Sequence, residues 1–266
     1  MQNRHIDRER YFTELAETSR DWYISYLRRY RNIDRNSRIL EIGCGEGGNL
    51  LPFAELGCTV AGFDLASGKI ENARKFFAAR GCAGSFACAD FLKENPFSGG
   101  GKFDIILVHD VIEHIEPEGK DAFFARLKLY LKPDGIVFFG FPAWQMPFGG
   151  HQQICRSKVC SKVPFVHVLP SCIYGAWLRM FGEDKARIAE LMSIKRSRMT
   201  PEKFETLCAS HGYEVIDRTF WFISPHYKAK FHLRPRRLWG WLGHIPYIRN
   251  WFTTSCFYVI DIKNTL

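Results

Sequence analysis

The chain of 266 residues is 46% hydrophobic and 15% aromatic, which suits one α/β domain with insertions and excludes a disordered chain. The charged start of the chain predicts no signal peptide, and no apolar run approaches the roughly 20 residues of a membrane span, so no transmembrane helix is expected. The nine cysteines are scattered and include no C-x-x-C pair. Together these features predict a reducing, cytoplasmic setting. The net charge of +9 is concentrated between Lys185 and Arg249, which predicts either an acidic partner or a solvated basic face.

The first half of the chain alternates helix and strand patterns. Residues 9–30 place apolar side chains at helical spacing, and a strand at 37–42 then runs into a glycine-rich turn. The alternation continues with a helix at 49–57, a strand at 58–64, a helix at 67–81, strands at 85–90 and 102–110, a helix followed by a turn at 117–135, and a strand at 136–142. Because the strands are apolar on both faces, we expect a doubly wound, Rossmann-like α/β sheet covered by helices on both sides.

The last third of the chain differs in composition. Residues 143–183 form an aromatic insertion punctuated by Pro and Gly, and helices are expected at 184–194 and from Thr200-Pro201 onward. The segments 212–223 and 254–263 predict a sixth and a seventh strand that pair antiparallel. We therefore expect a single domain over 1–266, made of a helical segment at 1–36, a core at 37–142, a pocket-forming or lid insertion at 143–200, and a C-terminal helix and strand pair at 201–266.

Residues 38–48, RILEIGCGEGG, can be matched to two cofactor motifs. Gly43, Gly45 and Gly48 fit the dinucleotide pattern G-x-G-x-x-G, whereas Glu41 to Gly47 form E-x-G-x-G-x-G. Glu41 would repel a pyrophosphate at this turn but would attract the sulfonium and ammonium groups of S-adenosylmethionine. We therefore expect an acid-lined site, without a nearby Lys or Arg, that binds a cationic cofactor.

Polar residues also follow the next three strands. Asp64 ends the second strand, where a carboxylate can accept both ribose hydroxyls, as it also does in NAD enzymes. Asp90 follows the third strand and suits an adenine amino group, and Phe91 is placed to contact the ring. His109 and Asp110 follow the fourth strand. Because the carboxyl ends of parallel strands meet at one edge of the sheet, these residues predict a ligand site at that edge.

Together these segments resemble the class I S-adenosylmethionine-dependent methyltransferases. The resemblance rests on the terminal strand pair and on EIGCGEG (41–47), GFD (62–64), ADF (89–91), FDIILVHDVIEHI (103–115) and LKPDG (131–135). It implies a seven-stranded sheet of order 3-2-1-4-5-7-6 with an antiparallel seventh strand, and S-adenosylhomocysteine as the product. It assigns Glu41, Gly43 and Gly45 to the methionine moiety, Asp64 to the ribose, Asp90 and Phe91 to the adenine, and His109 to the methionine border. Cys44, Gly47 and Leu65 complete the cofactor-binding residues that we expect.

The segment after the fourth strand offers candidate catalytic residues. Asp110, Glu113 and His114 would share one face of a helical turn, because they are spaced at i, i+3 and i+4. This D-x-x-E-H pattern resembles the E-x-x-E-H segment of ubiquinone-pathway O-methyltransferases, whose acids and histidine can bind a divalent metal; here an aspartate replaces the first glutamate. We expect capping or structural roles first, a general-base role for His114 with Asp110 second, and a metal bound by all three only as the weaker alternative.

His151 is the second candidate catalytic residue. It lies in GGHQQ (149–153), within the insertion where the acceptor pocket is expected. Gly149 and Gly150 would let the backbone approach a ligand, and Gln152 and Gln153 would offer hydrogen-bonding groups. A loop that packs on itself is an equally good interpretation of the same residues.

The leading hypothesis is an S-adenosylmethionine-dependent O-methyltransferase acting on a small molecule, namely a sugar, a glycolipid precursor or a phenol-like acceptor. Two alternatives are an NAD-dependent oxidoreductase on a Rossmann sheet and a non-catalytic S-adenosylmethionine-binding protein. Residues 225–252 interleave bases with aromatics, which predicts first an element packed on the domain, second a peripheral contact with an anionic membrane surface, and last an RNA-binding surface. No pattern predicts an oligomeric state.

Overall fold

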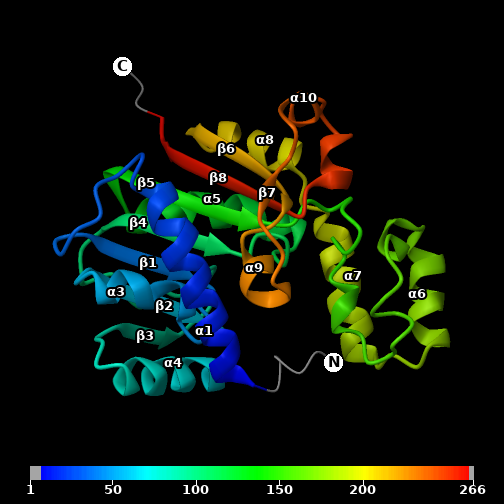
Figure 1. Ribbon diagram of the computed structural model, residues 1–266, viewed down its shortest axis with the longest axis horizontal. Coiled ribbons are helices and arrows are strands. Elements are labelled where there is room, and N and C mark those ends of the chain that lie inside the picture. Colours follow the sequence, from blue (N-terminus) through cyan, green and yellow to red (C-terminus); the bar gives the residue numbers. More distant parts are fainter. Residues whose placement is uncertain (1–6, 264–266) are drawn as a thin grey trace.

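A computed structural model describes residues 7–263, which fold around one eight-stranded sheet of order β3-β2-β1-β4-β5-β8-β6-β7 (Figure 1). The strands are β1 (Arg38–Ile42), β2 (Thr59–Asp64), β3 (Ser85–Cys88), β4 (Phe103–His109), β5 (Leu131–Phe141), β6 (Tyr213–Ile223), β7 (Arg236–Arg237) and β8 (Ser255–Ile262). The pairs among β1 to β5 are parallel, whereas β8 runs antiparallel to both β5 and β6. The expected order of the seven predicted strands is therefore confirmed, and so is the antiparallel strand between the fifth and the sixth.

Two features of the sheet differ from the prediction. The eighth strand, β7, is only two residues long and pairs with β6 at Trp221 and Ile223. The fifth strand begins at Leu131 instead of residue 136, because Leu131 pairs with Phe103 across a register shift. A two-residue strand has no periodicity to detect, and the turn residues of 131–135 hide the early pairing.

The first face of the sheet is covered by the helices of the N-terminal half. They are α1 (Arg8–Thr18), a π-helical turn (Ser19–Tyr23), α2 (Ile24–Leu27), α3 (Leu51–Glu55) and α4 (Ser67–Ala79). Their apolar side chains, such as Phe12, Phe53 and Phe77, pack in one cluster with strand residues that include Ile105 and Phe138. The strand side chains on this face, among them Ile105 and Phe138, are therefore buried against the N-terminal helices.

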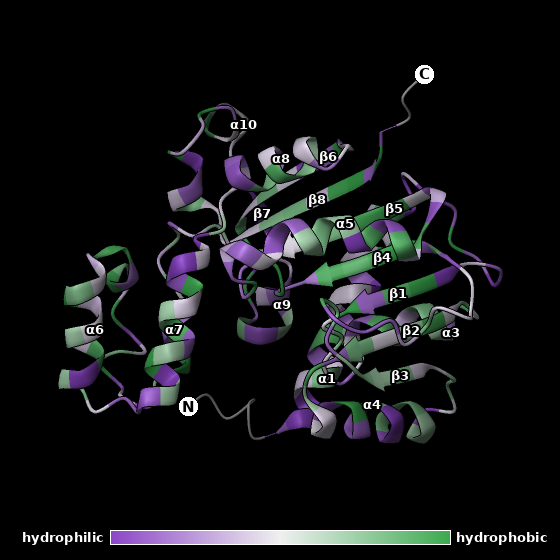
Figure 2. Cartoon of the chain, turned by 180° about the vertical axis from the view of Figure 1, so that it is seen from behind, coloured by the Kyte–Doolittle hydropathy of each residue, from purple (hydrophilic) through white to green (hydrophobic). Residues whose placement is uncertain are grey.

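The second face is covered by α5 (Lys120–Tyr130) and α8 (Pro201–Ser210). Phe124 and Phe204 from these helices pack on strand residues such as Phe139 and Tyr258. Neighbouring residues of one strand thus enter opposite clusters, as Phe138 and Phe139 do, because side chains alternate along a strand. Figure 2 shows β4 and β8 as predominantly hydrophobic, in agreement with a sheet buried on both faces.

The insertion after β5 stands beside the sheet and contains α6 (Ser171–Met180) and α7 (Lys185–Ser197) (Figure 1). It has a small hydrophobic cluster of its own that includes Tyr174, Leu178 and Leu191. The Nζ atom of the buried Lys195 donates to the carbonyls of His167 and Leu169, at 2.7 and 2.6 Å. This lysine therefore ties the loop before α6 to α7.

The C-terminal region adds two short helices, α9 (His226–Phe231) and α10 (Gly240–Gly243), between β6 and β8. Within residues 7–263, no helix combines the length and the apolar character that crossing a membrane requires.

Candidate active site

The glycine turn lies at the carboxyl end of β1. Gly43, Gly45 and Gly47 all have positive φ, at 71°, 53° and 81°, a conformation that glycine adopts without steric cost. A Cβ on Gly43 would lie 2.4 Å from Cγ2 of Val111, so the turn after β1 touches the turn after β4. The N–H groups of Gly43 and Cys44 both donate to the carbonyl of Phe63, which fixes the turn against β2. The cofactor turn and the predicted catalytic segment are therefore neighbours.

Asp64 closes the other side of this turn. One oxygen, Oδ2, accepts the Gly45 N–H at 3.0 Å, and Oδ1 accepts the Ala66 N–H at 2.9 Å. The Nζ atom of Lys69 lies 3.8 Å from Oδ2, so the expectation of a site without a nearby lysine is wrong. Lys69 lies in the first turn of α4 and offsets part of the negative charge of Asp64. The spacing Asp64-x4-Lys69 is the sequence signal that indicates this contact.

Glu41 is buried beneath the turn. Its Oε1 accepts a hydrogen bond from Asn49 Nδ2 at 2.6 Å, and its Oε2 has no partner among the described residues. Burial raises the pKa of Glu41 to about 8, and the hydrogen bond from Asn49 opposes this rise only in part. A buried carboxyl with an unused oxygen is suited to a cation that enters the turn.

The predicted adenine contacts are not equally placed. Asp90 lies at the end of β3, where its Oδ1 accepts the Leu92 N–H and its Oδ2 lies 3.2 Å from Lys93 Nζ. Leu65, which follows Asp64 at the end of β2, is largely exposed. Phe91, however, is buried and stacks on Phe63 with ring centroids 5.6 Å apart, so its ring belongs to the core of the second face. Composition alone could not separate a core phenylalanine from a ring-stacking one.

A cavity of about 300 Å³ opens beside the end of β4. Asp110 begins the turn there with a positive φ of 52°, and its N–H donates to the carbonyl of Gly140. Its carboxylate lies 3.5 Å from Nδ1 of His109, which also faces the cavity. Four of the predicted site residues line this cavity: His109, Asp110, His114 and His151. The segment after β4 and the insertion therefore meet in one cavity, as expected.

Other lining residues were not found by sequence reasoning. They come from α1, α7 and α9: Tyr11, Glu190, His226, Tyr227 and Lys230. The basic and aromatic composition of 225–252 is a sequence signal for the last three, although it predicts a packed element, a membrane contact or an RNA-binding surface and not a cavity wall. Tyr11 and Glu190 have no local pattern that marks them, because only the tertiary fold brings α1 and α7 to the cavity.

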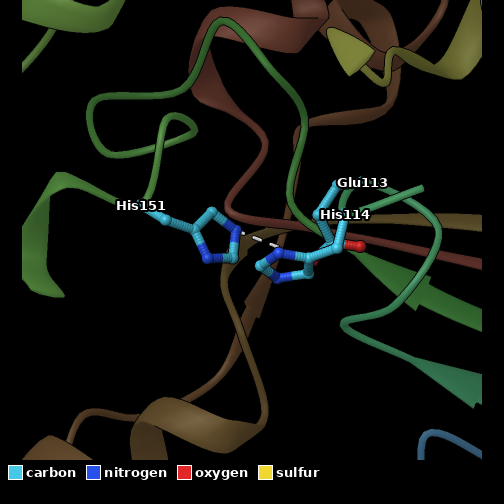
Figure 3. A group of neighbouring side chains, drawn as sticks. All are labelled: Glu113, His114 and His151. Atoms are coloured by element: carbon cyan, nitrogen blue, oxygen red, sulfur yellow. Dashed lines mark ion pairs between the residues drawn. The ribbon is translucent and has the colours of Figure 1, made fainter. Parts of the chain in front are cut away.

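Glu113, His114 and His151 form a cluster at the wall of this cavity (Figure 3). The two imidazole rings have centroids 4.8 Å apart, and His151 Nε2 lies 3.6 Å from Glu113 Oε1. Neither carboxylate oxygen of Glu113, which is 3% exposed, accepts a hydrogen bond from the described residues. Burial raises the pKa of Glu113 well above its ordinary value, and burial together with His114 lowers the pKa of His151 to about 3.

The donor set of this cluster fits a divalent transition metal. One ligand atom from each of the three residues lies within 4.8 Å of the others, and two imidazoles with a carboxylate are typical of zinc and iron sites. The set differs from the predicted alternative because His151 takes the place of Asp110. The structure thus joins the two candidate segments that the sequence presented separately.

The expected helical turn over 110–114 is wrong, because residues 111–115 form turns without a helix. Asp110 has a positive φ of 52°, and the His114 N–H donates to the Val111 carbonyl and not to the Asp110 carbonyl that a helical turn would use. The turn that results is held by Lys120, a buried residue of α5. Its Nζ donates to the carbonyls of Ile112 and Ile115 at 2.7 and 2.9 Å, and to Ser197 Oγ at 2.9 Å. The lysine therefore satisfies carbonyls that a helix would have used and fixes the turn that holds Glu113 and His114.

The loop at 149–153 packs partly on itself. A Cβ on Gly149 would lie 2.2 Å from the Trp144 carbonyl oxygen, and one on Gly150 would lie 2.3 Å from the His167 Cβ. These glycines make room for the loop, so their expected role of admitting a ligand is wrong. Gln152 is buried and donates to the Pro147 carbonyl, whereas Gln153 lines the cavity.

The sheet order, the antiparallel strand beside β5, and the glycine turn between Glu41 and Asp64 define the fold and cofactor edge of the class I S-adenosylmethionine-dependent methyltransferases. Residues 39–135 match the family model described as a methyltransferase domain. The chain therefore carries a methyltransferase domain of the kind whose cofactor is S-adenosylmethionine.

The relatives agree with this assignment. The chain is 32% identical, over 124 residues, to the ubiquinone biosynthesis O-methyltransferase of Bartonella bacilliformis. The matched region covers 45% of this chain and 48% of that protein. The chain thus spans about half the length of the curated relatives it matches.

Two solved structures share the fold over most of the chain. A S-adenosylmethionine-dependent methyltransferase from Clostridium acetobutylicum matches with a TM-score of 0.59 at 12% identity, covering 93% of this chain and 92% of that one. Magnesium protoporphyrin IX methyltransferase from Synechocystis, solved with bound S-adenosylhomocysteine, matches with a TM-score of 0.56 at 14% identity, covering 94% and 84%.

Proposed function

We propose that the protein transfers the methyl group of S-adenosylmethionine to a hydroxyl group of a small acceptor bound in the cavity beside β4. The observation that supports this proposal is the position of the cavity. It begins at His109 and Asp110, directly beside the glycine turn, which Val111 touches. An acceptor there would lie next to the cofactor, and methyl transfer requires such contact, at roughly 3 Å between the reacting atoms.

The cavity lining favours an oxygen acceptor with several polar groups. Histidines, a lysine and carboxylates line it together with Met146, Phe148 and Ile154, so a hydroxyl-bearing ring finds both hydrogen bonds and apolar contact. The name of the Bartonella relative supports an O-methyltransferase and is consistent with a phenol-like acceptor. A sugar or a glycolipid precursor suits the same lining, so a panel must separate the three.

The chain's own residues would deprotonate the acceptor. The acceptor oxygen attacks the methyl carbon, the electron pair of the C–S bond returns to sulfur to give a thioether, and the hydroxyl proton passes to an imidazole nitrogen of His114 or His151. Both rings line the cavity, and His114 is the stronger candidate for the base, because burial lowers the pKa of His151 to about 3 and makes it a weak base near neutral pH. A divalent metal held by Glu113, His114 and His151 would instead lower the pKa of the acceptor hydroxyl.

The first experiment measures S-adenosylhomocysteine formed when the protein is given S-adenosylmethionine and a catechol, a sugar or a glycolipid precursor. We expect turnover with one of these three classes of acceptor, and loss of that turnover in the His151→Ala variant. Thermal stabilisation by NADH but not by S-adenosylhomocysteine would support the oxidoreductase instead. Cofactor binding without turnover on any acceptor would support a non-catalytic binding protein.

The second experiment separates a base from a metal. Purified protein is analysed for bound Zn, Fe, Mn and Co by mass spectrometry, and activity is measured after chelation and after return of each metal. A single metal that is bound by the wild type and missing from the His114→Ala variant would support a metal site at Glu113, His114 and His151. Undiminished activity in a metal-free protein would leave the imidazole as the base.

A further inference from the structure

The segment that follows β7 exposes an unusual set of large apolar side chains. Trp241 and Tyr247 are 68% and 65% exposed, although each belongs to a residue type that folded proteins mostly cover. The exposed residues of this surface, which we call the aromatic surface, are Trp239, Trp241, Ile245, Tyr247, Ile248, Trp251 and Phe252. It holds three of the seven tryptophans of the chain.

The aromatic surface extends onto the insertion. The rings of Phe165 and Trp251 have centroids 5.7 Å apart, and Val168 borders the same shallow hollow as Tyr247 and Trp251. Phe165 and Val168 are themselves exposed. Two segments that are far apart in the sequence therefore contribute to one apolar area, and the insertion and the C-terminal region meet there.

The segment is anchored from beneath, so the exposure is not the result of a loose loop. Leu238 and Leu242 are buried in the core of the second face. Arg249 is buried and its Nη2 lies 3.1 Å from Glu202 Oε1, while Asn250 donates to Glu202 Oε2 at 2.8 Å. The fold thus holds the polar residues of the segment inward and leaves its aromatic residues outward.

A basic stretch directly precedes the aromatic surface. Residues 225–252 contain six Lys and Arg and no Asp or Glu. Arg234, Arg236 and Arg237 are exposed at or beside the edge strand β7, and no ion pair joins them to an acid within residues 7–263. Exposed Arg residues next to exposed Trp and Tyr match an anionic bilayer surface, where indole and phenol rings lie at the headgroup level.

We propose that the aromatic surface, together with Arg234, Arg236 and Arg237, docks the protein on an anionic lipid membrane. A basic protein partner would need acidic residues on this surface, and residues 225–252 contain none. Their positive charge complements negative headgroups instead. Docking is peripheral, because the rings enter only the headgroup region. The proposal is independent of the methyl-transfer reaction, since none of the residues of this surface lines the cavity.

The test uses vesicles of phosphatidylcholine alone and of phosphatidylcholine with phosphatidylglycerol, with binding measured by co-sedimentation and by the blue shift of tryptophan emission. The full chain is expected to bind the anionic vesicles at least about tenfold more tightly than the neutral ones, and to be released by high salt. Trp239→Ala/Trp241→Ala and Arg234→Gln/Arg236→Gln should each weaken binding about tenfold or more. Both change exposed side chains, so circular dichroism should match the wild type.

The matched controls are Met180→Ala/Leu129→Ala and Lys75→Gln/Lys185→Gln, which remove exposed apolar and basic side chains elsewhere. These variants should bind like the wild type. Equal binding to both kinds of vesicle, or unchanged binding of the Trp239→Ala/Trp241→Ala variant, would overturn the proposal. It would also be overturned if vesicles did not bind while light scattering showed a dimer that this variant abolishes, because the surface would then join two copies of the chain.

Discussion

The strength of cofactor binding should fall as the pH falls, because Glu41 must lose a proton to meet a cation. Glu41 is buried, and its pKa is raised to about 8 by that burial. In the free protein the carboxyl is therefore mostly protonated at neutral pH, whereas the ligand ammonium favours the carboxylate. Binding then releases a proton, so the affinity rises with pH until the carboxyl of the free protein is ionised.

The size of the effect follows from the pKa. Between pH 5.5 and 7.5, a carboxyl with a pKa of about 8 that is ionised in the complex changes the affinity roughly 75-fold, or about 2.5 kcal/mol. S-adenosylhomocysteine is the suitable ligand, since it carries the same ammonium group. The range stops at pH 7.5 because the Glu41 carboxyl of the free protein has a pKa of about 8 and is largely ionised above that value, where the affinity stops rising.

The assay is isothermal titration calorimetry in buffers of different ionisation enthalpy, which reports the affinity and the number of protons released. Glu41→Gln is the matched control, because its amide can still meet Asn49 but cannot ionise. The slope of log affinity against pH should be near one in the wild type and near zero in the variant. A flat wild-type profile, or an equal slope in Glu41→Gln, would refute the assignment of Glu41 to the cationic end of the cofactor.

Three further predictions concern other parts of the site. Asp64→Ala should weaken S-adenosylhomocysteine binding by about 1–3 kcal/mol, because it removes the acceptor of two turn N–H groups as well as the proposed ribose partner; an unchanged dissociation constant in calorimetry would exclude Asp64 from the site. His151→Ala should lower turnover roughly 10²- to 10⁴-fold with unchanged cofactor affinity, whereas Gln153→Ala should keep most of the activity; full activity in His151→Ala would assign this residue to packing. Lys120→Met should lower the free energy of unfolding by about 1–3 kcal/mol and also lower turnover, because it leaves two buried carbonyls unpaired. Denaturant unfolding measures this loss, with the exposed Lys75→Met as control, and equal stability of the two variants would contradict the role given to Lys120.

The cofactor edge could be predicted from the sequence because its determinants are local. Glu41 and Asp64 each stand at the end of an apolar strand pattern, and the glycines between them need positive φ for a turn that follows directly. Parallel packing then brings the strand ends together without further information. Phe91 shows the limit of this reasoning, since its place in the second-face core depends on Phe63 and Phe123, whose positions only the folded sheet determines.

The cluster of Glu113, His114 and His151 could be predicted only in pieces, because its contacts join distant segments. His151 lies 38 positions after Glu113, and no spacing rule relates a loop of the insertion to a turn after β4. The i, i+4 rule that placed Asp110 and His114 on one helical face failed, because it assumes helical backbone angles throughout the segment, whereas Asp110 has a positive φ of 52°. The His114 N–H bonds to the Val111 carbonyl, and the carbonyls of Ile112 and Ile115 bond to Lys120 from α5.

Two buried lysines explain why the cavity keeps its shape although loops form much of its wall. Lys120 joins the turn after β4 to Ser197 at the end of α7, and Lys195, two residues before it on α7, holds the carbonyls of the loop before α6. A buried ammonium is costly unless each donor finds an acceptor, so both lysines require the loops to stay in the positions that satisfy them. One helix of the insertion, α7, is thereby tied both to the turn after β4 and to the loop before α6. Residues without any motif, Lys120 and Lys195, thus connect the turn that carries Glu113 and His114, through α7, to the loop where His167 packs on Gly150, next to His151.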